Sequence, residues 1–279
     1  MTIPQNEYLV YFFFQGLAGG GGGGSGEGCL IGTDEPVPED HGGLEAGTVI
    51  KDQTACAVLE TILFPYQYPS FTSFYINGQA TTLEVGQIMS GGVRDFRWST
   101  TNNQNIIANS IEISDVTESN VLGSNLVNDG QENLDIGSDK VETTPNSSHT
   151  WRITGRNTRN QTFSRDFKVT WLARVYWGLT TNENPDETEI KNAANSQLKN
   201  TKNGTYNFSN PGGEYYYFIA FPVNYGSTYN SWRDTDSGFE VDGTFANDVS
   251  VTNSFGTTLT YKVLRTTYKQ TTDLNSQLS

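Results

Sequence analysis

The chain has 279 residues, of which 17% are charged, and 31 acidic against 17 basic residues leave a net charge of -14. Nucleic acids and anionic membrane surfaces are bound through basic faces, so this charge balance excludes both as expected partners. The chain has two cysteines, Cys29 and Cys56, and two histidines. These are too few for a disulfide scaffold or a Cys-based zinc site, and we expect no cofactor and no metal.

Residues 1–46 form a region of unusual composition, in which an apolar segment leads into six consecutive glycines at 19–24. Glycine loses much conformational entropy on ordering, so we expect an extended arm with no core of its own. The arm is either a flexible tether or a segment that orders against a partner. Its aromatic run favours the second reading and makes an edge strand on another subunit one way to dock. The docking residues are Tyr8, Leu9, Val10, Tyr11, Phe12, Phe13 and Phe14.

The same apolar segment is far shorter than the ~20 residues that span a bilayer, so we expect no membrane insertion. No Lys or Arg precedes Lys51, which is unlike a secretory signal. We therefore expect the protein to be made in a cytoplasm.

Residues 47–69 are predicted to form a short connector made of a strand and a helix. Thr54 is a plausible N-cap, and residues 55–63 supply the apolar positions of the helix. Pro65 ends it.

Residues 70–177 carry the signals of several short strands. Apolar and polar residues alternate in segments 94–100, 110–114, 150–154 and 163–171. Asn77-Gly78 is predicted to form a hairpin turn, and residues 128–130 another turn. About seven short strands in this span predict an immunoglobulin-like β-sandwich.

Residues 178–279 are predicted to form a second, β-rich domain. Segment 214–221 is apolar on both faces, which predicts a central or inter-subunit strand. Segments 248–253 and 257–267 predict a hairpin. Segment 186–199 has weak helical periodicity, and the polar tail 271–279 is predicted to fray.

Residues that could carry chemistry are few, and we expect no enzyme and no catalytic residues. His41 and His149 are both predicted to be solvated loop histidines. Asp234 and Asp236 resemble part of a calcium loop but lack the further acids that such a loop needs, which favours an acidic surface turn. The glycine run is followed by prolines and not by a helix, so it does not predict a nucleotide site.

Aromatic residues gather in the C-terminal region, and two interpretations of them stay open. They pack a core or an oligomer interface, or they form an exposed lectin-like surface that stacks on sugar rings. The residues concerned are Tyr215, Tyr217, Tyr225, Tyr229 and Trp232.

An ordered series of segments lies between residues 43 and 267, at 43–50, 58–66, 69–74, 84–86, 96–100, 110–113, 149–155, 163–169, 174–178, 215–222 and 251–256. This series resembles virion structural proteins of tailed bacteriophages. The resemblance implies a tail, neck or head fibre, another appendage, or a fibre-base adaptor in the virion, usually a homotrimer. The arm of residues 1–46 falls outside this match. In such proteins the N-terminus commonly anchors to the particle, which implies that the arm docks to other virion proteins, such as portal, neck, tail or capsid components. The alternative is a receptor-binding, lectin-like module that recognises a glycan on the host surface.

Overall fold

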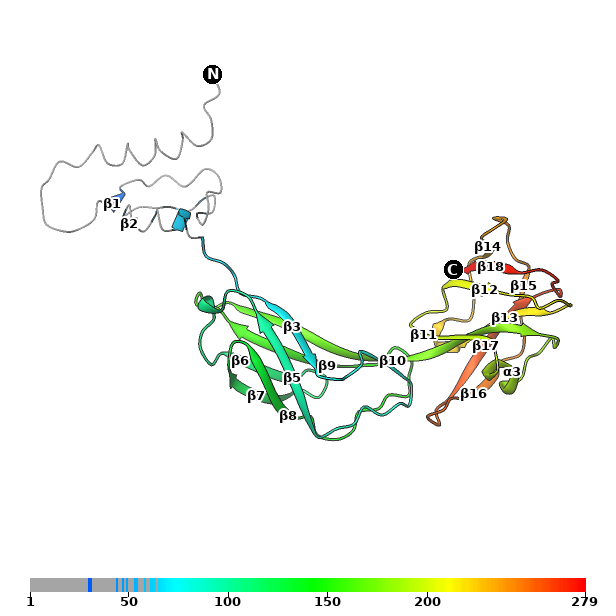
Figure 1. Ribbon diagram of the computed structural model, residues 1–279, viewed down its shortest axis with the longest axis horizontal. Helices are drawn as coiled ribbons and strands as arrows, with labels where there is room; N and C mark the ends of the chain where they lie inside the picture. The colour runs from blue at the N-terminus through cyan, green and yellow to red at the C-terminus, as the bar shows by residue number, and fades with distance from the viewer. Residues whose placement is uncertain are drawn as a thin grey trace, which may run out of the picture. The chain divides into compact units, whose positions relative to one another are not determined.

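The computed structural model divides into two units, Met1–Tyr68 and Pro69–Ser279 (Figure 1). It describes residues 30–31, 44, 47, 49, 53–54, 58, 61–63 and 65–279. In the first unit, β1 (Leu30–Ile31) pairs antiparallel with β2 (Gln53–Thr54). Residues 58 and 61–63 are helical, within the span where the sequence predicted a helix. The predicted docking segment 8–14 and His41 lie outside the described residues.

Eight strands build the first of two β-sandwiches in the second unit. They are β3 (Phe71–Ile76), β4 (Thr82–Glu84), β5 (Val93–Thr100), β6 (Ile111–Asp115), β7 (Asn120–Leu126), β8 (Gly130–Asp135), β9 (Ser148–Arg156) and β10 (Thr162–Thr180). A 3-10 turn, η1 (Asn103–Asn105), follows β5.

The two sheets of this sandwich have the order β3-β5-β8 and β7-β6-β9-β10-β4. All neighbours are antiparallel except β4, which runs parallel to β10. The chain thus crosses repeatedly between two sheets, with β6–β7 and β9–β10 as hairpins within one of them, and this is the immunoglobulin-like arrangement that the sequence predicted. The Asn77-Gly78 turn does not make the predicted hairpin, because β3 pairs with β5 and β4 crosses to the other sheet.

The core of the first sandwich follows from period-2 alternation. Phe96 and Trp98 point inward from β5, Trp151 and Ile153 from β9, and Trp171 from β10, and all five are buried. Trp151 packs against both Phe96 and a further aromatic residue of β10, Phe167.

Strand β10 is 19 residues long and belongs to both sandwiches (Figure 1). Its residues 162–170 pair with β9, and its residues 176–180 pair with β13. At ~3.3 Å per residue such a strand extends for about 60 Å. The domain boundary predicted between residues 177 and 178 therefore falls inside a continuous strand.

The second sandwich adds eight strands, a helix and a 3-10 turn to the end of β10. They are α3 (Glu187–Lys191), β11 (Asn195–Lys199), β12 (Gly204–Phe208), β13 (Tyr216–Pro222), η2 (Val223–Tyr225), β14 (Trp232–Asp234), β15 (Gly243–Phe245), β16 (Val249–Thr252), β17 (Thr258–Thr266) and β18 (Leu274–Leu278). One sheet continues from β10 through β13 and β17, and a three-stranded sheet has the order β12-β18-β14. No helix in the described residues is long and apolar enough to cross a membrane.

Strand β13 is central, and every one of its residues is buried. Tyr217, Ile219 and Phe221 belong to the same core as the three-stranded sheet. Phe218 and Ala220 point to the opposite face, into a second core with Ile190 of α3. This second layer explains why the segment is apolar on both faces.

Two predictions for this region are wrong. The helix is limited to Glu187–Lys191, where Asp186 and Glu189 form a capping box, and residues 195–199 form β11 instead. The C-terminal tail does not fray, because β18 is the central strand of its sheet. Its alternate residues Ser276 and Leu278 are buried, and this alternation outweighs the polar composition of the tail.

Candidate functional site

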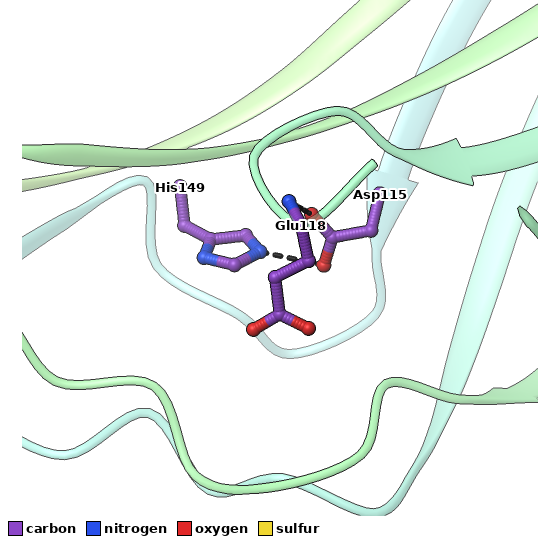
Figure 2. A group of neighbouring side chains, drawn as sticks. All are labelled: Asp115, Glu118 and His149. Atoms are coloured by element: carbon purple, nitrogen blue, oxygen red, sulfur yellow. Dashed lines mark hydrogen bonds and ion pairs between the residues drawn. The ribbon is translucent and has the colours of Figure 1, made fainter. Parts of the chain in front are cut away.

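A cluster of ionisable side chains lies at one end of the first sandwich (Figure 2). Asp115 is the last residue of β6, Glu118 lies in the turn that follows, and His149 is near the start of β9. Strand β6 pairs antiparallel with β9, and Asp115 lies opposite Trp151, so the backbone register brings Asp115 close to His149.

Two members of the cluster, Asp115 and His149, are buried, whereas Glu118 is exposed, and hydrogen bonds connect them. His149 Nε2 lies 2.6 Å from Asp115 Oδ2, and the Glu118 backbone N–H donates to Asp115 Oδ1 over 2.9 Å. Asp115 is 1% exposed and His149 is 4% exposed. The Lys140 ammonium, on a side chain that is also buried, pairs with the Glu118 carboxylate. The His149 ring packs on Trp151 with 4.5 Å between centroids, which fixes its orientation.

Asp115, Glu118 and His149 offer one imidazole and two carboxylate donors within 4.8 Å of one another. That spacing and donor set suit a divalent metal ion. However, Asp115 and His149 already bond each other, and Lys140 places a positive charge on Glu118. A metal ion would have to displace a buried ammonium, so these side chains fit a structural polar cluster better than a metal centre.

The prediction that His149 is a solvated loop histidine is wrong. The sequence did contain a signal, because His149, Trp151 and Ile153 are alternate residues and share one face of β9. In the same way Ile111, Ile113 and Asp115 share the buried face of β6. The buried face of β6 ends with Asp115, and that of β9 begins with His149. These two polar side chains contact each other.

The aromatic residues of the C-terminal region lie in the core of a single chain. Tyr217 and Trp232 are fully buried and Tyr225 is nearly so, while Tyr215 and Tyr229 are half-buried against the same core. The hydroxyls of Tyr217 and Tyr225 bond backbone groups. The three buried rings cannot stack on a sugar in this structure, and core packing is the interpretation that the burial supports.

Asp234 and Asp236 form an acidic surface turn. The Ser237 hydroxyl donates to Asp234 Oδ2, and the Asp236 backbone N–H donates to Asp234 Oδ1. These two bonds lower the pKa of the Asp234 carboxyl. Both oxygens of Asp234 are thus used inside the turn, and the third nearby acid, Asp242, accepts from the Thr267 hydroxyl.

Comparison with known proteins gives no family. No protein-family model matches the chain, and no curated protein matches its sequence. Among solved structures, it is similar to an alpha-L-rhamnosidase from Streptomyces avermitilis complexed with L-rhamnose, at 7% identity and a TM-score of 0.22. The alignment covers 76% of this chain and 23% of the rhamnosidase, so the chain spans under a quarter of that protein's length.

Proposed function

We propose that the protein is a structural subunit of a bacteriophage virion, acting as a fibre, appendage or fibre-base adaptor. The observation that carries this proposal is strand β10, which runs unbroken through two sandwiches. A continuous strand with a packed core on both of its halves suits a spacer that holds one end of a molecule at a set distance from the other.

The order of segments in the sequence supports the same proposal, because it resembles virion structural proteins. In this role the arm of residues 1–46 docks to another virion protein through its aromatic run. A homotrimer is the expected assembly.

The ionisable cluster does not alter the proposal, because its groups bond one another and hold the β6–β7 turn to β9. We do not extend the proposal to glycan recognition through the C-terminal aromatic residues, because three of the five are buried. No enzymatic reaction is assigned to the protein.

The proposal is tested by measuring which proteins are present in purified particles of the phage that encodes this chain. We expect quantitative mass spectrometry to find this chain at a fixed copy number in particles purified by density gradient. A full-length variant with Tyr11, Phe12, Phe13 and Phe14 replaced by Ser should lose incorporation because it lacks the apolar docking surface.

A matched control replaces Gly20 and Gly22 by Ser, which changes the tether but not the aromatic run. This control should incorporate normally. Particles that lack the chain altogether would overturn the proposed function, and normal incorporation of the aromatic variant would overturn the docking role of the arm.

A further inference from the structure

The point at which β10 passes from one sandwich to the other has its own set of contacts. Strand β4 pairs with residues 170–172 of β10, and β11 pairs with residues 173–177. Between the residues that pair with β9 and those that pair with β13, the Ala173 N–H donates to the Tyr225 hydroxyl over 3.1 Å. A side chain of the second sandwich therefore satisfies the backbone at the crossing.

A largely buried ion pair lies beside this crossing. Glu84, at the end of β4, is 5% exposed, and its Oε2 accepts from Arg174 Nη2 over 2.9 Å. The hydrogen bond to Glu84 raises the pKa of Arg174 above its usual value. The Arg174 backbone carbonyl in turn accepts from the hydroxyl of Tyr261 on β17. This arrangement ties β4, β10 and β17 together.

The turn between β16 and β17 reaches across to the segment after β4. Asn253 Nδ2 donates to the Val85 carbonyl over 2.6 Å. Its Oδ1 accepts from the backbone N–H groups of Phe255 and Thr257, each over 3.0 Å. The amide of Asn253 is therefore held by its own turn, with its NH₂ group directed at the first sandwich.

Gly86 is the counterpart of this turn on the first sandwich. Its φ is +80°, in the left-handed region that favours glycine, and an added Cβ would overlap the Thr257 hydroxyl and lie 3.4 Å from the Phe255 Cβ. Only a residue without a side chain lets the turn approach this closely. A separate contact, from Asn146 Nδ2 to the Asn200 carbonyl over 3.0 Å, links the two sandwiches through other loops.

We infer that the turn of residues 253–257 is a clasp, which closes on Val85 and Gly86 and makes the two sandwiches move as one body. The shared strand alone would leave the sandwiches free to bend about residues 171–175, because β4 pairs with it only as far as residue 172 and β11 only from residue 173. The clasp, the Glu84–Arg174 pair and the Tyr225 hydroxyl remove that freedom. This inference does not depend on a role in virions.

The inference is tested by distance measurement between two spin labels in the full chain. Cys29 and Cys56 are replaced by Ser, and labels are attached at Glu132→Cys on β8 and Asn207→Cys on β12, which are both exposed. We expect double electron–electron resonance spectroscopy to give one narrow distribution of distances between the two labels. A broad or multiple distribution in this otherwise unaltered protein would overturn the inference by itself.

Two variants then test the clasp. Asn253→Asp keeps the acceptor oxygen that holds the turn but sets a carboxylate against the Val85 carbonyl, and Gly86→Ala blocks the approach of Thr257. Each should replace the narrow peak with a broad distribution while the circular dichroism spectrum stays unchanged. Asn230→Asp, an exposed substitution of the same kind, is the control and should keep the narrow peak. Narrow peaks in both clasp variants would show that the clasp does not set the geometry.

Discussion

The two sandwiches differ in how they bury their central strands. In the first, β5 and β9 alternate inward apolar and outward polar residues, so one face of each strand is buried. In the second, β13 is buried on both faces because the three-stranded sheet covers one side and α3 covers the other. Two layers suffice for the first sandwich, and the second needs a third layer to cover its central strand.

The largest expected effect comes from the core of the first sandwich. Trp151→Ala removes a fully buried ring that packs on Phe96, Phe167 and His149. We expect the free energy of unfolding to fall by about 3–5 kcal/mol, measured by chemical denaturation. Both sandwiches contain buried aromatic residues. If the sandwiches are coupled, the near-ultraviolet circular dichroism of the whole chain will therefore be lost in a single transition. Separate transitions would show two independent domains.

The polar cluster of Asp115, Glu118 and His149 gives the next effect. Asp115→Ala leaves His149 without its partner and removes the acceptor of the Glu118 N–H, so we expect a loss of about 3 kcal/mol. Glu112→Ala, on the half-buried opposite face of β6, is the control and should cost far less. Adding Zn²⁺ to the unaltered protein should leave its melting temperature unchanged, because Lys140 already pairs with Glu118. A zinc-dependent rise that Asp115→Ala abolishes would instead identify a metal site.

The C-terminal strand gives a smaller effect. Leu278→Ala removes a buried side chain from β18, and we expect a loss of about 2 kcal/mol. Gln277→Ala, the exposed neighbour, should be close to neutral. Equal stabilities of the two variants, compared by thermal unfolding, would mean that the tail frays as its composition suggested.

The smallest effect is expected at the surface of the first sandwich. The Arg152 guanidinium, bonded to both oxygens of the carboxylate opposite it, lowers the pKa of Asp166. The stability that this pair contributes is therefore present above the unfolded pKa of Asp166 and is lost as the pH falls through the folded pKa. Arg152→Gln should move the acid-unfolding midpoint to slightly higher pH. Lys168→Gln on the same sheet should not move it, and an equal shift in both variants would indicate a general charge effect.

The sequence predicted the first sandwich well because its strands alternate and one face is buried. Alternation also placed His149 and Asp115 on buried faces, but the polarity of His149 favoured a loop and masked the signal. In the second sandwich, the burial of β13 on both faces could be predicted, but the layer that covers it could not. Pairings such as β18 with both β12 and β14 join residues far apart in the chain, and no local pattern specifies them.

The pairing of β4 with β10 was beyond sequence reasoning for the same reason. Asn77-Gly78 is a strong turn signal, yet the chain after it enters the opposite sheet. The contact between Asn253 and the segment before Gly86 could not be predicted either, because Asn253 and Val85 lie 168 positions apart in the chain.

Hydrogen exchange along β10 tests most directly the claim that this strand runs unbroken through both sandwiches, with no hinge at the crossing. Mass spectrometry of peptides from residues 162–180 reports the opening of each part of the strand. The account predicts slow exchange with similar protection from the β9-paired residues to the β13-paired residues. Fast exchange confined to residues 171–175, with protection on both sides, would contradict it and show a hinge at the crossing.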